Sequence, residues 1–505
     1  MRCPRPVAPE RRRSSRPLAA LVAGAAVLAL AGVTATPAAA AGPPDPDLAR
    51  VLTSVMADSR VQQASSAAVV LDARSGAVLY DRSGARALVP ASNTKSLTAA
   101  AALHTLGPSY RFKTEVFRRG KVVGGAVQGR LYLKGYGDPT TRESDYRSLA
   151  QQVRRAGITR VTGRLAVDAT WFDAQRYNPG WSTGYSDDYY AAEISALTVA
   201  PNADLDSGTV LVNYAPGKKG GSKATITTTP AAAAKHVKIV NTTTTGSRSS
   251  SSTVSARRSH GSGTITVSGR VPLGRSRAST LVTVHRPELY AAAVFRAELA
   301  RAGVRVDGGT VVVGTPASSR TRLARDTSMP LADLLVPFLK LSNNMHAEAL
   351  TKAMAARSGR PGSWAAGLEV TTAYLKSLGV PMSGVSLTDG SGLTRRNTVT
   401  ARALATTLLE VRGEPWFAAF HRALPVAGDS RRMVGGTLRS RMVGTRAAGN
   451  AHAKTGTLTG VTAISGYVTG RDGRPYVFAM ISNHRGASPR PVENTLVVTL
   501  AGWRR

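Results

Sequence analysis

Pro90-Ala91-Ser92-Asn93-Thr94-Lys95 places a serine three residues before a lysine, just ahead of an alanine-rich run that ends near Gly107-Pro108. The proline and the run predict a helix that begins here, so Ser92 and Lys95 share one helical face. A serine is a weak nucleophile until a base takes its proton, and a neutral lysine amine can be that base. The free N–H groups at a helix start also favour a developing oxyanion. The alternative is a helix-capping serine beside a solvated lysine, but no other lysine of the chain follows a serine at this spacing.

A second candidate motif is Ser342-Asn343-Asn344, which lies between two predicted helices. Ser342 is the only serine of the chain with an asparagine two residues later. A second hydroxyl beside a serine–lysine pair can pass a proton to a leaving amine. The amide of Asn344 can hold a peptide carbonyl of a substrate. The alternative is a helix-cap cluster of serine and asparagine, which is a common arrangement.

The third candidate motif is Lys454-Thr455-Gly456-Thr457, which contains the only Lys-Thr-Gly of the chain and precedes a predicted strand over 461–469. On an edge strand, one lysine and two hydroxyls can face a cleft and bind a carboxylate. Gly456 can let the backbone of a substrate approach closely. The alternative is an exposed lysine on a strand.

Each motif is weak alone, but three single copies in the order Ser-x-x-Lys, Ser-x-Asn, Lys-Thr-Gly are specific together. The chain resembles the penicillin-recognising serine acyltransferases. The long separation of Ser92 from Ser342 makes it most similar to the class C low-molecular-mass penicillin-binding proteins, the D-alanyl-D-alanine carboxypeptidase/endopeptidase family. The likeness covers the chain after residue 41 and is weakest over 204–285. Further segments match this family: Gly137-Asp138-Pro139-Thr140, Glu193-Ile194-Ser195-Ala196-Leu197, Asp389-Gly390-Ser391-Gly392-Leu393, Leu424-Pro425-Val426-Ala427-Gly428 and Gly436-Thr437-Leu438.

The resemblance implies a serine-type D-Ala-D-Ala carboxypeptidase, with possible DD-endopeptidase action, on peptidoglycan stem peptides. Ser92 would attack the carbonyl between the two terminal D-alanines. Lys95 would be the base, and its pKa would have to be depressed by burial and by the neighbouring Lys454. Ser342 would pass the proton to the leaving D-alanine. Water would then hydrolyse the acyl-enzyme, with no metal and no cofactor, and β-lactam antibiotics would inhibit because they mimic the substrate.

The resemblance also implies the binding residues. Asn344 would hold the peptide, while Lys454, Thr455 and Thr457 would bind the terminal carboxylate beside Gly456. The backbone N–H groups of Ser92 and Thr457 would form the oxyanion hole.

The pattern of helices and strands predicts an α+β multidomain chain. We expect a catalytic transpeptidase-like domain, formed by 42–107 and 320–505, with an antiparallel sheet flanked by helices and a helical subdomain. Inserted β-rich domains would split it: domain II over 108–203 and 286–319, and a small domain III over 204–285. Within 204–285, short β-branched runs recur between Ser/Thr/Gly/Lys-rich stretches, which favours an all-β module with polar loops over disorder. At a finer level we expect one helix over 45–61 and a strand over 122–127.

Residues 1–41 predict a signal peptide, because six arginines precede an apolar run that ends in small residues. The only cysteine, Cys3, would leave with it, which excludes thiol catalysis and thiolate metal sites in the mature chain. We therefore expect an extracytoplasmic protein, secreted or associated with the cell wall. No second apolar run is long enough for a transmembrane segment.

The formal net charge is +36, which implies acidic surroundings or an acidic partner. Nucleic acid is one candidate and an anionic cell-wall polymer is another. Aromatic residues make up only 5% of the chain and do not interleave with basic ones in any nucleic-acid-binding motif, so we expect no nucleic-acid partner.

Four other interpretations compete with this one. Gly180-Trp181-Ser182-Thr183-Gly184 fits the nucleophile-elbow pattern, but no apolar strand precedes it. His346 and His452 lie near two motifs, yet no His-Glu-x-x-His pair is present, so a metalloprotease is not favoured. A β-lactamase or esterase of the same fold would turn penicillin over quickly. A wall-binding scaffold without catalysis would form no penicillin adduct.

Overall fold

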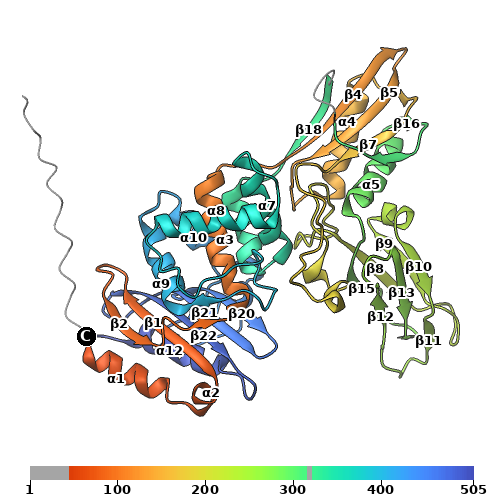
Figure 1. The fold of residues 1–505 in the computed structure, drawn as a ribbon. Helices are drawn as coiled ribbons and strands as arrows, with labels where there is room; N and C mark the ends of the chain where they lie inside the picture. The colour runs from red at the N-terminus through yellow and green to blue at the C-terminus, as the bar shows by residue number, and fades with distance from the viewer. Residues whose placement is uncertain (1–44, 316–320) are drawn as a thin grey trace, which may run out of the picture. The chain divides into compact units, whose positions relative to one another are not determined.

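The structure is a computed structural model that describes residues 45–315 and 321–505 (Figure 1). The predicted signal peptide, residues 1–41, lies outside the described residues. Over the described part of the chain, no helix combines the length and the apolar character needed to cross a membrane.

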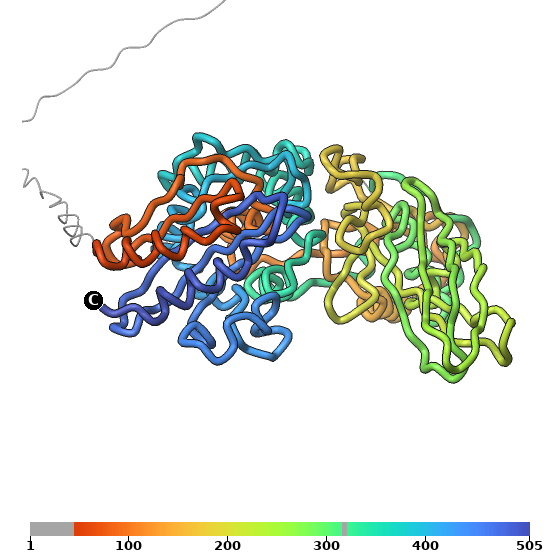
Figure 2. Tube along the Cα trace, turned by 90° about the horizontal axis from the view of Figure 1, so that it is seen from below, coloured from red at the N-terminus to blue at the C-terminus, as the bar shows by residue number. Residues whose placement is uncertain are grey.

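A five-stranded sheet joins the beginning and the end of the described chain. Its order is β2-β1-β22-β21-β20, and β1 pairs antiparallel with β22 from Ser65–Asn483 to Asp72–Tyr476. Figure 2 shows these early and late segments, red and blue, side by side. The predicted split of the catalytic domain therefore closes through strand pairing. The bounds are β1 Ser65–Asp72, β2 Val78–Arg82, β20 His452–Leu458, β21 Val461–Thr469 and β22 Pro475–Asn483.

Alternation along β1 assigns the two faces of this sheet. Ala67, Val69 and Leu71 belong to a core shared with the helical part of the domain. Ala68 and Val70 belong to a second core, which they share with residues of the terminal helices. Those helices are α1 Pro46–Val55 and α12 Arg490–Gly502, and α2 Ser59–Gln62 follows α1. The single helix expected over 45–61 is thus two helices, and Asp58 caps the second by accepting the N–H of Arg60 at 2.9 Å.

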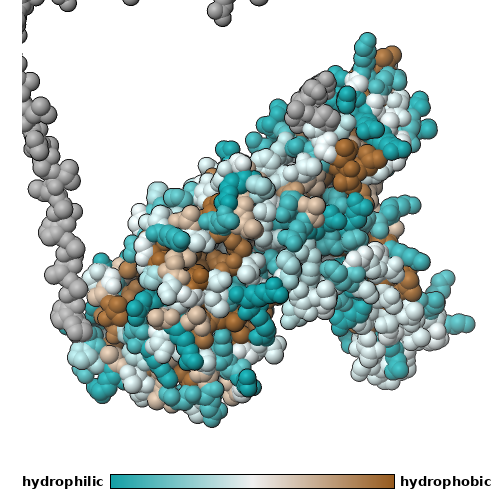
Figure 3. All heavy atoms as spheres, viewed as in Figure 1, coloured by the Kyte–Doolittle hydropathy of each residue, from teal (hydrophilic) through white to brown (hydrophobic). Residues whose placement is uncertain are grey.

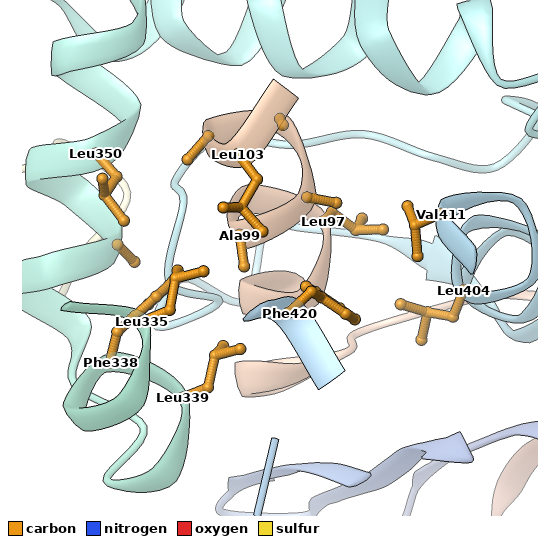
Figure 4. Close-up of a cluster of buried hydrophobic side chains, with 14 of the residues drawn as sticks. Leu97, Ala99, Leu103, Leu335, Phe338, Leu339, Leu350, Leu404, Val411 and Phe420 are labelled. Atoms are coloured by element: carbon orange, nitrogen blue, oxygen red, sulfur yellow. The ribbon is translucent and has the colours of Figure 1, made fainter. Parts of the chain in front are cut away.

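Helix α3, Thr94–Leu106, lies at the centre of the helical part (Figure 4). Residues 94–103 are buried on every side, which suits its alanine-rich sequence because small side chains let neighbouring helices approach. Leu97 and Leu103 pack among Phe338, Leu350 and Phe420, and burying each such side chain contributes about 1.5–3 kcal/mol. The surrounding helices are α6 Leu331–Lys340, α7 Asn344–Arg357, α8 Trp364–Ser377, α9 Ala401–Glu410 and α10 Phe417–Ala423.

The first inserted part contains a seven-stranded sheet flanked by α4 Glu143–Arg155 and α5 Pro287–Arg301. The single strand expected over 122–127 is instead two strand ends joined by a hairpin turn: residues 122–123 end β4, residues 126–127 begin β5, and Gly124-Gly125, both with positive φ, form the turn. Strand β18 pairs with β4, so this sheet extends past the boundary expected at residue 319. The strands are β4 Lys113–Val123, β5 Ala126–Gly135, β6 Arg160–Val161, β7 Leu165–Asp168, β16 Arg305–Val306, β17 Thr310–Val312 and β18 Thr321–Thr327.

The second inserted part consists of short strands, as the β-branched runs predict. Val210, Val212, Ile265 and Val267 join the apolar core of the first inserted part, so the two parts share one core. The sheets are β15-β8-β9, β10-β13-β12 and β11-β14. Their strands are β8 Thr209–Ala215, β9 Thr225–Thr229, β10 Lys238–Asn241, β11 Thr244–Gly246, β12 Ser255–Arg257, β13 Thr264–Ser268, β14 Arg270–Pro272 and β15 Ala278–Thr283.

Residues 169–206 return from the first inserted sheet to the catalytic helices, and we call them the return segment. Phe172, Trp181 and Ile194 of this segment belong to the same core as α3. The buried amine of Lys352 on α7 donates to Asp173 Oδ1 at 2.5 Å and to the carbonyl of Gln175 at 2.6 Å. The sequence predicts domain II for most of this segment, but its side chains pack against the catalytic part.

Candidate active site

Ser92 lies in the 3-10 turn Ala91–Asn93, which leads directly into α3. Lys95, in the first turn of α3, donates from Nζ to Ser92 Oγ at 3.0 Å. Ala91 has a φ of +47°, a strained value for a residue with a side chain, and such strain concentrates at functional sites. The side chain of Ser92 is partly exposed, whereas Lys95 is fully buried. The hydroxyl can therefore meet a substrate while the amine stays away from water.

Lys95 Nζ has two further acceptors, Asn344 Oδ1 at 2.6 Å and the carbonyl of Ser391 at 2.7 Å. Burial lowers the pKa of Lys95 to about 7, against the opposing charges of Asp389 and Glu348. At neutral pH about half of the Lys95 amines are therefore uncharged and able to accept a proton.

Ser342 and Lys454 form a second contact between a hydroxyl and an amine. Lys454 Nζ donates to Ser342 Oγ at 2.9 Å and to the carbonyl of Thr455 at 2.7 Å. Ser342 has a φ of +59°, so the turn before α7 holds it in an unusual backbone conformation. Burial, and then the charge of Lys95, lower the pKa of Lys454 well below its usual value. The structure thus brings the three sequence motifs together around two neighbouring buried amines.

Strand β20 is the edge strand of the sheet and presents the third motif. Thr455 Oγ1 donates to Thr437 Oγ1 at 2.8 Å, and the exposed Thr457 Oγ1 accepts from the guanidinium of Arg490 at 3.4 Å. A Cβ on Gly456 would lie 2.6 Å from the carbonyl oxygen of Pro90. The missing side chain therefore lets β20 approach the nucleophile turn, which is a different close approach from the one expected at this residue.

Asn344 holds Lys95 with its oxygen, and its Nδ2 donates to the carbonyl of Tyr190 in the return segment at 2.8 Å. Beside it, Asn343 Nδ2 and His346 Nε2 meet the carbonyl of Leu205 at 3.3 and 3.0 Å. The return segment is thus hydrogen-bonded directly to the Ser-x-Asn turn. An amide nitrogen carries two N–H groups, so one N–H of Asn344 is left for a substrate.

Sequence reasoning assigned no role to Glu348, a fully buried carboxylate one helical turn after Asn344. It accepts the N–H of Ser391 at 2.9 Å, the N–H of Gly390 at 3.0 Å and the indole N–H of Trp364 at 2.7 Å. Burial and the charge of Asp389 raise the pKa of Glu348 to about 7, although these donors favour the carboxylate. Glu348 therefore fixes the carbonyl that Lys95 contacts. The helical spacing from Asn344 was the available sequence signal.

Asp389 holds the other side of the same turn. It accepts the N–H of Gly392 at 2.7 Å, the N–H of Thr394 at 2.8 Å and the indole N–H of Trp181 at 2.9 Å. Gly392 has a φ of +78°, and a Cβ there would lie 1.8 Å from the carbonyl oxygen of Ala91. Asp389 belongs to a family segment that the sequence singled out without a function, and the structure places that segment against the nucleophile turn.

The other sequence candidates lie elsewhere. Ser182 is exposed and caps a 3-10 turn by accepting the N–H of Gly184 at 3.2 Å, with no strand before it, so the nucleophile elbow is excluded. His346 is buried, and burial lowers its pKa to about 4. His452 stacks on His421 with ring centroids 4.2 Å apart.

Comparison with known proteins decides the family. The profile of the D-Ala-D-Ala carboxypeptidase 3 (S13) family matches residues 48–502. The chain is 38% identical to the D-alanyl-D-alanine carboxypeptidase of Actinomadura sp. (strain R39), over 99% of this chain and 94% of the relative. The chain belongs to the S13 family. By family it is a D-Ala-D-Ala carboxypeptidase, and so a hydrolase of the peptidase class, as the three motifs predict.

Other relatives agree with the S13 assignment. The carboxypeptidase DacB of Mycolicibacterium smegmatis is 30% identical over 85% of this chain and 79% of its own length. The crystal structure of penicillin-binding protein 4 from Haemophilus influenzae superposes with a TM-score of 0.76 at 22% identity, covering 90% of this chain and 99% of that chain. That likeness shows the fold: a penicillin-recognising serine hydrolase with inserted domains. The predicted fold class is confirmed.

Proposed function

We propose that this S13 carboxypeptidase releases the terminal D-alanine of peptidoglycan stem peptides through an acyl-enzyme on Ser92. The contact between Lys95 Nζ and Ser92 Oγ carries the proposal, because it joins a partly exposed hydroxyl to a buried amine of lowered pKa. No carboxylate of the described residues forms an ion pair with Lys95 that would keep the amine charged.

The first step forms the acyl-enzyme. Ser92 Oγ bonds to the carbonyl carbon between the two D-alanines, and its proton moves to Lys95 Nζ. The developing oxyanion would be held by the backbone N–H groups of Ser92 and Thr457, and the close approach of β20 to the nucleophile turn at Gly456 supports this assignment. The C–N bond then breaks, and the leaving amine takes the proton that Lys95 had accepted, by way of Ser342, which Lys454 contacts, so that Lys95 is neutral again.

The second step regenerates the enzyme. Water attacks the ester carbonyl and gives a proton to Lys95. The ester C–O bond to Ser92 then breaks, and Ser92 Oγ takes that proton from Lys95 to become a hydroxyl again. The sum is hydrolysis of one peptide bond. A β-lactam would form an ester at the same serine. The similar penicillin-binding protein 4 from Haemophilus influenzae was solved in complex with a β-lactam.

The amine of Lys454 and the hydroxyls of Thr455 and Thr457 would bind the terminal carboxylate. Arg490 lies beside Thr457 and adds a guanidinium to this subsite. Asn344 would hold the peptide through its second N–H.

The proposal includes the location and the division of the chain. Residues 1–41 would direct export, so that the enzyme works in the wall, where anionic polymers would be partners of its basic surface. The catalytic domain would consist of 42–107 and the chain after β18. Domain III would keep its expected range, 204–285. Domain II would keep 108–203 and continue from 286 through β18, with the return segment packed on the catalytic part.

A fluorescent penicillin tests the proposal on the wild type and on Ser92→Ala. We expect a stable adduct on the wild type alone, and release of D-alanine from a stem pentapeptide by the wild type alone. Rapid turnover of penicillin would instead support a β-lactamase or esterase. A folded wild type that forms no adduct and releases no D-alanine would support the wall-binding scaffold.

A further inference from the structure

The second inserted part carries charge of one sign only. Residues 207–285, which we call the basic module, contain no aspartate and no glutamate. Acidic residues occur in the chain on both sides of the module, beginning with Asp206 before it and Glu288 after it. The eleven basic residues of the module are Lys218, Lys219, Lys223, Lys235, Lys238, Arg248, Arg257, Arg258, Arg270, Arg275 and Arg277.

Ten of these eleven side chains face solvent, and only one of the ten has a counter-charge among the described residues. Arg258 is buried, where it donates to Thr283 Oγ1 at 2.8 Å, and the other ten are exposed. Arg257 lies 3.3 Å from Asp187, and within the described ranges no other basic residue of the module has an ion-pair partner. A single solvated cation on a protein surface needs no partner. Ten exposed cations on a module without carboxylates, however, produce a positive local potential.

The fold gathers seven of them around the short pair β11–β14. The loop that carries Lys218, Lys219 and Lys223 is bonded to β11, because the N–H of Gly221 donates to the carbonyl of Thr245 at 2.8 Å. The N–H of Leu273 donates to the carbonyl of Gly246 at 3.1 Å, which brings the loop after β14 to the same strand. We call this set the basic tip: Lys218, Lys219, Lys223, Arg248, Arg270, Arg275 and Arg277.

Two close approaches confirm that these side chains share one region. A Cβ on Gly274 would lie 2.5 Å from the guanidinium of Arg248, and a Cβ on Gly246 would lie 2.4 Å from Cδ of Arg270. Arg277 donates to Thr227 Oγ1 at 3.0 Å, next to the loop with the lysines. Figure 1 shows β11 at the end of this module.

The chemistry around the basic tip suits phosphate oxygens. Residues 242–253 are all serine or threonine except Gly246 and Arg248, so hydroxyl donors accompany the cations. Tyr214 is the only phenylalanine, tyrosine or tryptophan of the module, and this single half-buried ring beside Arg275 and Arg277 provides no series of platforms on which successive nucleotide bases could stack. No large apolar side chain of the module is strongly exposed, so nothing is available to enter a bilayer. In Figure 3, which has the view of Figure 1, the lower end of the basic module is mostly pale and teal.

We propose that the basic tip binds a linear phosphodiester polymer of the cell wall, of the polyol-phosphate class. Such a polymer presents regularly spaced anions without bases or acyl chains, which matches exposed cations and hydroxyls accompanied by one half-buried aromatic ring and no strongly exposed apolar side chain. Binding there holds the enzyme beside its proposed substrate and leaves the Ser92 site unoccupied. The inference rests on the proposed action in the wall, but it concerns binding and not catalysis.

Two variants with equal loss of charge test the inference on the full purified protein. The tip variant carries Lys218→Gln, Lys219→Gln, Lys223→Gln and Arg275→Gln. The control variant carries Arg86→Gln, Arg155→Gln, Arg439→Gln and Arg471→Gln, which are exposed residues without side-chain hydrogen bonds in the described structure. Affinity for immobilised poly(glycerol phosphate) is measured across a range of salt concentrations, and penicillin acylation is measured in parallel.

We expect the tip variant to bind at least ten-fold more weakly and the control within about two-fold of the wild type. The slope of log K against log salt should fall in magnitude by roughly 3 for the tip variant, because four phosphate contacts are lost. Acylation should be unchanged in both variants, so that a failure of the catalytic proposal would show separately. Equal weakening of both variants would overturn the inference, since net charge alone would then explain binding. Equally tight binding of the wild type to oligothymidylate, to polyglutamate or to phosphatidylglycerol vesicles would also overturn it.

Discussion

At the scale of single residues, the site depends on how Lys95 is kept as a base. The amine is fully buried and touches only neutral acceptors, while the carboxylates of Glu348 and Asp389 lie behind the carbonyl of Ser391. Burial lowers the pKa of Lys95, and the two negative charges oppose this, so the pKa falls less than it would by burial alone. The balance leaves an amine that can gain and lose a proton at neutral pH.

Acylation by penicillin should therefore rise with pH and reach half its plateau near pH 7. Below the pKa of Lys95 the amine is an ammonium and cannot take the proton of Ser92; above it the amine is free. The second-order acylation rate, measured from pH 5 to 9, checks this. A profile that is flat across this range would contradict a titrating Lys95.

Glu348→Gln should move the rising, acidic part of this pH profile (the acid limb) to lower pH and reduce the plateau rate about ten-fold or more. The lost negative charge no longer supports the ammonium form, so the pKa of Lys95 falls and the base weakens. Asp389→Asn should shift the limb in the same direction, which keeps the test available if one variant folds poorly. Glu298→Gln removes a buried carboxylate of the inserted part and is the matched control. A lower plateau with an unmoved limb would mean that Glu348 acts only as a structural support.

At the scale of elements, the position of β20 against the turn before α3 determines the site. Gly456 has no side chain where a Cβ would meet the carbonyl of Pro90, and Asn93 on the same turn accepts from Ser465 of the next strand, β21. The strand that presents Lys454 and the turn that presents Ser92 are thus in direct contact. The distance between this strand and this turn depends on the absence of a Cβ at Gly456.

Gly456→Ala should lower the acylation rate at least ten-fold and destabilise the fold by about 1–3 kcal/mol, because the added methyl pushes β20 from the nucleophile turn. Acylation kinetics and urea unfolding measure the two effects. Gly486→Ala is the control, since a Cβ there would meet nothing within 4 Å. Normal acylation by Gly456→Ala would show that the close approach is not needed for the oxyanion hole.

At the scale of the whole molecule, the return segment connects the inserted part to the catalytic centre. It reaches Asp389 through Trp181, Asn344 through Tyr190, and α7 through the buried Lys352. The insertion is therefore more than an appended module, because part of it bonds to Asn344, which contacts Lys95, and to Asp389.

Trp181→Phe should destabilise the protein by about 1–3 kcal/mol and slow acylation. The indole N–H is removed while the ring packing is largely kept, so the buried carboxylate of Asp389 loses a donor. Thermal unfolding and penicillin labelling measure this. Tyr189→Phe, on a half-exposed ring of the same segment, should change neither quantity. An unaffected Trp181→Phe would mean that the return segment does not influence the active site.

The sequence by itself determined the parts that depend on local spacing. Ser92 and Lys95 share a helical turn, so their contact follows from a spacing of three residues, and the single-copy motifs identified the family. Long helices and β-branched strands were also predicted well, because each depends on a periodic pattern of apolar residues. The hairpin at Gly124-Gly125 was taken for a strand because the valines on both sides continue the apolar run.

Only the tertiary structure decided how distant segments meet. The carboxylates of Glu348 and Asp389 lie on different elements, and nothing in their local sequence shows that they hold the same turn under Lys95. The reason for Gly456 likewise appears only when Pro90 is placed opposite it. The return segment could not be assigned to the catalytic core, because burial of Trp181 and Phe172 depends on helices far away in the chain. Local patterns encode which element a residue joins, whereas packing and buried charge depend on which elements come into contact.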